Sequence, residues 1–184
     1  MTFCIIVFSP IALNTVPDET HSVDTRQYIF NTVTKYRPSV AQRYTDVIIE
    51  MADKYKLDPL LVLQVIKVES RFKWWAKSEK GALGPMQVMP DYWRHILYRF
   101  NDKILYAKLM ISPSDKYFKR IGYGTEAGCY VLRYYLDVHD QDLLLALISY
   151  GYRHSVVRKA QRKGMGYITN LDYIKKVVFN KGVK

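Results

Sequence analysis

Residues 58–90 read DPLLVLQVIKVESRFKWWAKSEKGALGPMQVMP, and this stretch decides the fold. Its opening Asp-Pro pair is a strong start signal for a helix, because Asp can cap the first turn and Pro suits the first helical position. Residues 60–70 are apolar nearly all round, so we expect a helix that is buried at the centre of the domain. Paired tryptophans, a Ser-Glu-Lys-Gly-Ala loop and a Gly-Pro-Met-Gln turn follow this helix.

Helical periodicity continues through most of the remaining chain. We expect further helices over residues 25–37, 39–55, 90–100, 125–138, 141–150 and 171–179. Thr125 opens one of them, and Asp140 and Asn170 are the expected N-caps of the last two. Residues 111–124 look irregular, and residues 164–166 form a predicted loop. The sequence has no alternating strand of useful length and no internal repeat, so it predicts an all-α fold.

The charge of the chain is unusual, whereas its size and hydrophobicity are ordinary for one globular domain. The 184 residues are 49% hydrophobic and 24% charged, which is enough apolar material for a core. The net charge is +11, and from Tyr152 onward nine Lys and Arg residues accompany a single acid, Asp172. Such a field attracts polyanions: nucleic acid, anionic membrane or acidic cell-wall polymer. A solvated face without a dedicated partner is the alternative.

We interpret residues 1–24 as an apolar N-terminal segment and linker, ahead of a single domain over residues 25–184 with a basic C-terminal end. The first thirteen residues lack the Lys or Arg of an ordinary signal peptide and are too short to span a bilayer. A truncated or atypical export signal is the favoured interpretation. A membrane-surface anchor and a disordered start are the alternatives. No other stretch approaches transmembrane length.

The cysteines and histidines do not suggest a metal or redox site. Cys4 and Cys129 cannot make a disulfide framework, and Cys129 lies in an apolar run where a small core residue is expected. The four histidines show no metal-binding spacing, so we expect no metal and no cofactor.

Glu69 is the strongest candidate for a catalytic residue. It follows a run of apolar residues at the C-terminal end of the expected central helix, where desolvation and the helix terminus both raise the pKa of a carboxyl group. A carboxylic acid that stays protonated near neutral pH can donate a proton to a glycosidic oxygen. An ordinary surface Glu that closes a helix is the plain alternative. The aromatic and amide groups nearby favour a glycoside-cleaving site.

Most glycosidases use a second carboxylate, and the sequence offers no obvious one. Glu79 and Asp91 are nearest to Glu69 in sequence, but both lie among polar or turn residues. Capping explains the acids at predicted helix starts and ends, namely Glu126, Asp137, Asp140 and Asp142. A site with one acid can still work if the substrate supplies its own nucleophile.

The segment from Glu69 to Pro90 resembles the signature of the soluble lytic transglycosylase (SLT) family, whose catalytic domain is goose-lysozyme-like. The family's Glu-Ser pair, a following Ser and the motif Gly-Ala-x-Gly-Leu-Met-Gln-x-Met-Pro match without a gap Glu69-Ser70, Ser78 and residues 81–90. Pro85 stands where the family usually has Leu.

Three weaker blocks also resemble the family. Residues 128–132 are similar to its Gly-x-x-Tyr-Leu helix, and Tyr173-Ile174 is similar to a Tyr-Val pair near its C-terminal end. Residues 146–151, ALISYG, resemble Ala-Leu-x-x-Tyr-Asn-Ala-Gly, with Gly151 in place of Asn. Together the blocks span residues 45–178.

The resemblance implies a lysozyme-like single domain whose buried central helix ends at the catalytic Glu69. It implies a peptidoglycan lytic transglycosylase that cleaves the β-1,4 bond between N-acetylmuramic acid and N-acetylglucosamine. Glu69 would act first as acid and then as base for the C6 hydroxyl, which attacks C1 and leaves a 1,6-anhydro end. A goose-type lysozyme that uses water is one alternative. A non-catalytic glycan-binding module, or a virion or secretion-apparatus component, is another, and Pro85 and Gly151 favour it.

The resemblance also implies the residues of the binding site. The expected substrate-binding residues are Ser78, Gln87, Met89, Tyr150 and Tyr173, and the expected supporting residues are Ser70, Gly84 and Met86. The Gln87 amide suits N-acetyl and hydroxyl groups, and glycine lets the backbone approach a sugar closely. Core packing is the alternative for both tyrosines. Trp74 and Trp75 could stack on sugar rings, although a core position for one of them fits equally well.

The predicted partners follow from the same resemblance. Peptidoglycan glycan strands are the expected substrate, and the basic surface would favour an anionic wall. We expect a location in the cell envelope or periplasm, or export. A secretion apparatus, a phage entry machine and a virion are the other settings that the sequence leaves open. Nucleic acid is a distant alternative suggested only by charge and tyrosine content.

Overall fold

The structure is a computed structural model, and it describes residues 23–90, 119–152, 154–168 and 171–179. Most of the described residues are helical, and the pairing of extended backbone among them is confined to isolated bridges that join Lys77, Leu83 and Val88. The helices are α1 (Val23–Thr34), η1 (Pro38–Val40), α2 (Ala41–Tyr55), α3 (Pro59–Ser70), α7 (Ile121–Val138), α8 (Leu143–Gly151), α9 (His154–Lys163), α10 (Met165–Ile168), α11 (Asp172–Ile174) and the π-helical η2 (Lys175–Phe179). The predicted all-α fold is confirmed.

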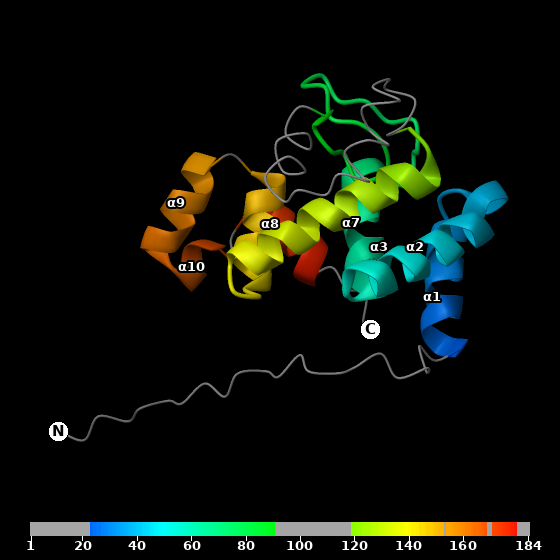
Figure 1. Cartoon of the computed structure of the whole chain (residues 1–184), viewed down its shortest axis with the longest axis horizontal. Helices are drawn as coiled ribbons and strands as arrows, with labels where there is room; N and C mark the ends of the chain where they lie inside the picture. The colour runs from blue at the N-terminus through cyan, green and yellow to red at the C-terminus, as the bar shows by residue number, and fades with distance from the viewer. Residues whose placement is uncertain (1–22, 91–118, 153, 169–170, 180–184) are drawn as a thin grey trace.

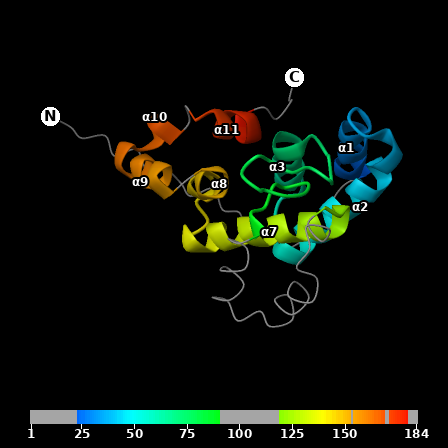
Figure 2. The same ribbon diagram turned by 90° about the horizontal axis from the view of Figure 1, so that it is seen from above.

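Helix α3 lies at the centre of the domain, as its apolar sequence predicts. The Asp58 side chain caps its first turn by accepting a hydrogen bond of 2.7 Å from the backbone N–H of Leu60, and Pro59 occupies the first turn. The helix contacts α1, α2 and η2. Figure 2 shows it between α1 on one side and α8 on the other, with α7 running across its direction. Leu63, Val65 and Ile66 have no exposed surface.

The chain reverses direction directly after the central helix. Arg71 and Phe72 both adopt the left-handed conformation, with φ of 51° and 61°, which ends α3 at Ser70. Such backbone costs about 1–2 kcal/mol for each residue other than Gly. The fully buried Phe72 ring offsets that cost: it packs edge-on against Tyr44, whose hydroxyl donates a 3.2 Å hydrogen bond to the Phe72 carbonyl. The turn therefore holds the end of α3 against α2.

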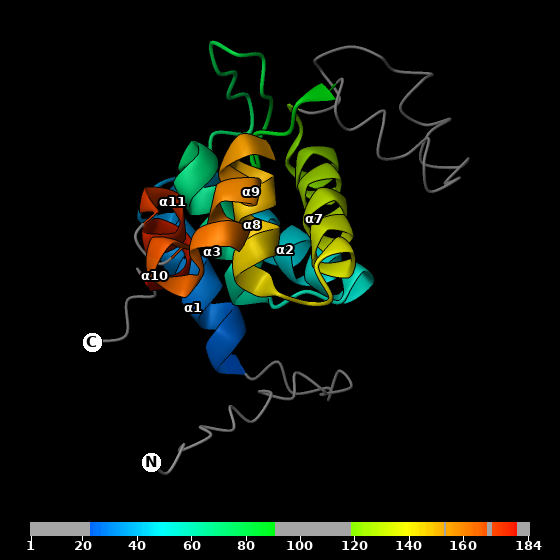
Figure 3. The ribbon, with the colours of Figure 1, turned by 90° about the vertical axis from the view of Figure 1, so that its left-hand side faces the viewer.

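The remaining helices wrap around α3 in two groups. Helix α7, the longest helix in the described part of the chain, packs on α2 and on α8, and Figure 3 shows it along one flank of the molecule. Helices α9 and α10 lie at the opposite end of the molecule from α1 (Figure 1). The core draws its largest buried side chains from both the helices and the loop after α3; they are Tyr44, Phe72, Ile29, Ile48, Leu63, Ile66, Leu83, Met86, Leu132 and Leu147.

Several predicted helix boundaries are wrong. Helix α7 begins at Ile121 and not at Thr125, because Ile121 and Gly124 are buried in the interface and the burial outweighs the helix-breaking tendency of glycine. Residues 165–168 form α10, where a loop was expected, and α1 begins at Val23, inside the predicted linker. Helix α9 was not predicted, because its sequence is dominated by Arg and Lys and contains few apolar residues.

The N-cap of α8 is Asp142 and not Asp140. The Asp142 carboxylate accepts hydrogen bonds of 2.9 and 3.0 Å from the backbone N–H groups of Leu144 and Leu145. Asp140 lies two residues earlier, in the left-handed conformation that short polar side chains tolerate in turns. The expected helix over residues 90–100, the irregular residues 111–118 and the cap at Asn170 lie outside the described residues, apart from Pro90.

Two further expectations concern the core and the membrane. Cys129 is fully buried in the core cluster, as predicted, and burial raises the pKa of its thiol; Cys4 lies outside the described residues. Among the described residues, none of the helices combines the length and the hydropathy required to cross a bilayer.

The cap assignment predicts a difference between two neighbouring aspartates. Asp142→Ala should lower the free energy of unfolding by about 1 kcal/mol, because two N–H groups at the start of α8 lose their acceptor. Asp140→Asn, which keeps a residue suited to the left-handed conformation, should change it by less than about 0.5 kcal/mol. Urea unfolding followed by circular dichroism measures both. Equal losses in the two variants would contradict the assignment.

Candidate active site

Glu69 lies in the last turn of α3, half-buried at the edge of a pocket. Burial raises the pKa of its carboxyl group to about 7, and a hydrogen-bonding interaction with Tyr173 opposes part of that rise. Near neutral pH the protonated and ionised forms of this group are therefore both well populated. A single carboxyl with that property can donate a proton and later take one back.

Tyr150 and Tyr173 lie beside Glu69, although Tyr150 belongs to α8 and Tyr173 to α11. Burial raises the pKa of both hydroxyl groups well above the ordinary value, and the charge of Glu69 adds to the effect. The Tyr150 hydroxyl donates a hydrogen bond of 2.7 Å to the Met86 carbonyl. The Tyr173 hydroxyl is buried without a hydrogen bond of ordinary geometry among the described groups, and it acts on Glu69 by lowering the pKa of that carboxyl.

Gly151 and Tyr152 hold the Tyr173 ring in place. A Cβ atom at Gly151 would lie 2.8 Å from two carbons of that ring, so only glycine leaves room for it. The Tyr152 hydroxyl accepts a hydrogen bond of 3.1 Å from the Tyr173 backbone N–H, and the two rings meet edge to face at 6.0 Å. Glycine at the position where the SLT pattern has Asn thus serves to seat Tyr173 beside the acid.

Hydrogen bonds within the loop over residues 76–88 fix its conformation. Gly81 and Gly84 have φ of 87° and 74°, values that favour glycine. The Ser78 hydroxyl accepts a hydrogen bond of 3.0 Å from the Ala82 N–H, which fastens the loop from within. The Gln87 N–H donates a hydrogen bond to the Gly84 carbonyl and closes a four-residue turn, in which Pro85 occupies the second position. Proline is favoured at that position, and its missing N–H is not needed there.

The predicted binding residues of this loop have different positions. Gln87 lines the pocket, and its side-chain amide donates a hydrogen bond of 2.9 Å to the Gly84 carbonyl, which leaves its own carbonyl oxygen for a ligand. Met86 is fully buried and lies so close to α7 that a Cβ at Gly128 would be 2.4 Å from it. Ser78 and Met89 are not among the residues that line the pocket, although Met89 is 40% exposed.

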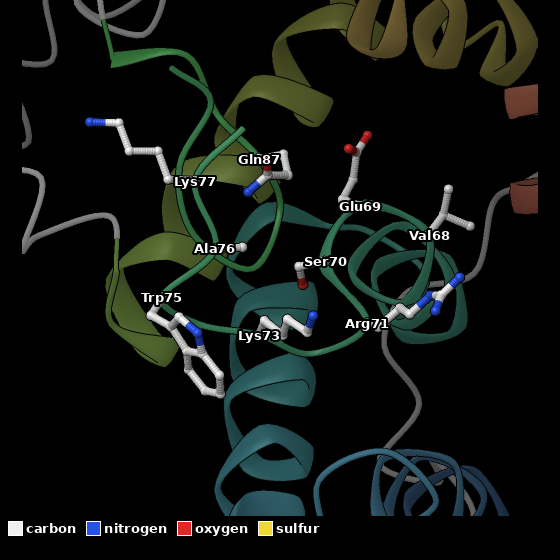
Figure 4. A pocket seen from close by; sticks show the side chains of 9 residues that line it. All are labelled: Val68, Glu69, Ser70, Arg71, Lys73, Trp75, Ala76, Lys77 and Gln87. Atoms are coloured by element: carbon white, nitrogen blue, oxygen red, sulfur yellow. The ribbon is translucent and has the colours of Figure 1, made fainter. Parts of the chain in front are cut away.

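The pocket beside Glu69 has a volume of about 510 Å³, and Arg71, Lys73 and Lys77 are among the residues that line it (Figure 4). Its lining residues are Val68, Glu69, Ser70, Arg71, Lys73, Trp75, Ala76, Lys77 and Gln87. Ser70 serves the helix itself, because its hydroxyl donates a hydrogen bond of 3.2 Å to the Ile66 carbonyl. Arg71, Lys73 and Lys77 were not predicted as site residues. Together with Trp75 they occupy every second position from 71 to 77, and this spacing was the available signal.

No carboxylate other than Glu69 lines this pocket among the described residues. Glu126 lies within α7 and pairs with Lys54 at 2.5 Å, so its interpretation as a helix cap was wrong. Asp137 pairs with Arg133 at 2.6 Å on the same helix. Glu79 is exposed, and Asp91 lies outside the described residues. No group of His, Cys, Asp and Glu in the described part of the chain is arranged to hold a metal ion.

The raised pKa of Glu69 predicts a stability that depends on pH. The pKa is about 7 in the folded chain, against 4.5 for an unperturbed Glu, so folding binds a proton and stability falls as pH rises from about 4.5 through 7. Glu69→Gln lacks this penalty, and it should exceed the wild type in free energy of unfolding by up to about 3 kcal/mol above pH 8. The two should converge below pH 4.5. Urea titrations at several pH values measure the difference, and a difference that does not vary with pH would contradict the burial of this charge.

The fit between Gly151 and Tyr173 predicts the effect of a single methyl group. Gly151→Ala should lower the free energy of unfolding by about 1–3 kcal/mol, because the ring must shift. Its Glu69 pKa should be higher than in the wild type, because the interaction with Tyr173 that lowers it is weakened. Gly122→Ala is the matched control, since a Cβ there meets no atom within 4 Å. NMR titration of the Glu69 carboxyl carbon reads the pKa, and an unchanged value in Gly151→Ala would refute the seating of Tyr173 by Gly151.

Comparison with known proteins agrees with this geometry. The family model described as Transglycosylase SLT domain matches residues 46–171. The chain is 28% identical over 113 residues to membrane-bound lytic murein transglycosylase E of Buchnera aphidicola, which covers 60% of this chain and 49% of that protein. It is 40% identical over 50 residues to membrane-bound lytic murein transglycosylase C of Actinobacillus pleuropneumoniae, which covers 27% of this chain and 14% of that protein.

A solved structure shares the fold. The X-ray structure of an inactive mutant of the lytic transglycosylase Slt from Pseudomonas aeruginosa superposes with a TM-score of 0.60 at 17% identity, covering 84% of this chain and 27% of that one. The chain spans about half the length, or less, of the curated relatives that it matches. Because the family model covers more than half of the chain, this protein belongs to the transglycosylase SLT domain family.

Proposed function

We propose that this chain is a peptidoglycan lytic transglycosylase that cleaves the β-1,4 bond between N-acetylmuramic acid and N-acetylglucosamine. The observation that carries the proposal is Glu69, a carboxyl with a pKa of about 7 in a pocket whose described lining contains no other carboxylate. The family membership and the names of the lytic murein transglycosylase relatives support the same reaction.

The reaction needs one group that is first an acid and then a base. Protonated Glu69 donates its proton to the glycosidic oxygen, and the bond from that oxygen to C1 of the muramyl sugar breaks. The C6 hydroxyl of the same sugar attacks C1, and its proton passes to the Glu69 carboxylate. The product is a 1,6-anhydro end, the enzyme returns to its protonated form, and no water is consumed.

The two tyrosines and the loop after α3 place polar groups and support the wall around Glu69. The raised pKa values of Tyr150 and Tyr173 keep both hydroxyl groups neutral. The single O–H of Tyr150 donates to the Met86 carbonyl, so Tyr150 supports the wall of the site, whereas the Tyr173 hydroxyl can donate a hydrogen bond near the acid. Gln87 offers a carbonyl oxygen to the sugar, whereas Ser70, Gly84 and Met86 support the wall behind it. Ser78 fastens the loop, so we assign it a structural part, and Met89 offers an exposed apolar contact outside the pocket lining.

The geometry of the described site favours neither of the two alternatives, a lysozyme and a non-catalytic module. A lysozyme needs a base to activate water, and the described pocket has no second carboxylate for it. A non-catalytic module was favoured by Pro85 and Gly151. Pro85 suits its turn, however, and Gly151 makes room for Tyr173 beside the acid. Both departures from the family pattern are therefore compatible with a working site.

We infer that the chain acts in the cell envelope, where its substrate lies, as the membrane-bound relatives suggest. Export of the chain, a part in a secretion apparatus or in phage entry, and association with a virion stay predictions of the sequence. The single domain over residues 25–184 also stays a prediction.

Digestion of purified peptidoglycan tests the proposed function. The wild type should release fragments with anhydro ends, which mass spectrometry distinguishes from hydrolysed ends because they are lighter by one water molecule. Glu69→Gln should lose at least about a hundredfold in rate, the contribution expected of a general acid. Glu79→Gln, which changes an exposed carboxylate, should digest like the wild type. Products with reducing ends would establish hydrolysis instead, and full activity of Glu69→Gln would remove Glu69 from the mechanism.

A further inference from the structure

Trp75 is an exposed indole on the wall of the pocket that holds Glu69. It is 45% exposed, although a large aromatic side chain usually gains stability from burial. Its neighbour Trp74 shows the contrast, because Trp74 is half-buried and packs against the hydrophobic core. Trp74 thus supports the fold, whereas Trp75 exposes its ring to the pocket.

Two contacts fix the orientation of the Trp75 ring. The Trp74 ring meets it at nearly right angles, with centroids 4.3 Å apart. The Arg37 guanidinium lies over the ring, 5.2 Å from its centroid. Arg37 directly precedes η1, so segments nearly forty residues apart in sequence assemble the platform. A ring that is already held in place loses little conformational entropy when a ligand packs on its exposed surface.

The charge next to Trp75 complements an acidic sugar. Figure 4 shows the Glu69 carboxylate toward one end of the pocket and the Trp75 indole toward the other, with Ser70 and Lys73 between them. Lys73 is exposed and lies beside Trp75, whereas the Lys77 side chain extends away from the pocket in the same view. An aromatic surface next to an ammonium group suits a saccharide that carries a carboxylate, because the ring packs on the apolar face of the sugar and the cation pairs with the acid.

We propose that Trp75 and Lys73 form a second saccharide subsite, separate from the point of cleavage at Glu69, that binds a neighbouring unit of the same glycan strand. Trp75 stacks on the sugar ring, and Lys73 pairs with a carboxylate on a muramyl unit. This proposal rests on the proposed function, since it takes the glycan strand as the ligand. The pocket is continuous from Glu69 to Trp75, so one strand can contact both.

Binding to the Glu69→Gln variant tests the subsite without turnover. The probes are a disaccharide and a tetrasaccharide of alternating N-acetylglucosamine and N-acetylmuramic acid, and a neutral tetramer of N-acetylglucosamine. In calorimetric titrations, adding Trp75→Ala should weaken both tetramers about tenfold, or about 1.4 kcal/mol, and the disaccharide by less than about twofold. Adding Lys73→Met should weaken the muramyl tetrasaccharide about threefold and leave the neutral tetramer unchanged.

Matched variants separate the subsite from general effects. Tyr28→Ala removes an aromatic side chain of similar exposure outside the pocket, and Lys80→Met removes an exposed cation of the same loop that does not line it. Both should bind all probes like Glu69→Gln alone. Trp75→Leu keeps an apolar side chain without an aromatic face, and it should repeat the loss if Trp75→Ala fails to fold.

The outcomes distinguish this proposal from the proposed function. If Glu69→Gln binds none of the probes, both proposals are wrong. If it binds them, and neither Trp75→Ala nor Trp75→Leu weakens the tetramers, only the subsite is wrong. An equal loss for disaccharide and tetrasaccharide would place Trp75 at the point of cleavage and so overturn a separate subsite. A tetrasaccharide with its peptide stems tells which carboxylate Lys73 binds, because the stem converts the lactyl carboxyl group into an amide: the lactyl group if the Lys73 effect disappears, a carboxylate of the stem if it persists or grows.

Discussion

The burial of α3 is the constraint on which both the fold and the site depend. Full burial of a side chain such as Leu63 or Ile66 contributes about 1.5–3 kcal/mol, and two of them offset the cost of desolvating Glu69 at the end of the same helix. That desolvation is also what raises the pKa of Glu69 to about 7. Burial of α3 thus both stabilises the domain and raises the pKa of Glu69.

Contacts between distant segments then complete the site around this acid. The Tyr150 hydroxyl binds the Met86 carbonyl, and Met86 in turn lies against Gly128 of α7, so α8, the loop and α7 are locked to one another. Tyr173 reaches Glu69 from α11 because Gly151 leaves space for its ring. Gly128 and Gly151 allow these close approaches, because neither has a Cβ atom that would collide with Met86 or with the Tyr173 ring.

The two departures from the family pattern change their meaning once the structure is known. In the sequence, Pro85 is a departure from the Leu of the SLT pattern, and Gly151 is the loss of a polar side chain beside Tyr150. In the structure, Pro85 occupies a turn position that favours proline, and the space at Gly151 is filled by Tyr173. Likewise only the tertiary structure separates Trp74, which supports the core, from Trp75, which faces the pocket.

The sequence by itself determined the helical fold, the burial of α3 and the position of Glu69 at its end, because periodicity and Asp-Pro capping act within a few residues. The same local rules misplaced the start of α7 and the cap of α8, where burial and turn conformation are decided by contacts with other helices. Tertiary structure alone decided that Tyr150 and Tyr173 meet Glu69, that Glu126 pairs with Lys54, and which cations line the pocket. The contacts of the two tyrosines and of Glu126 join residues seventy or more positions apart, a separation over which sequence spacing carries no information on distance in space.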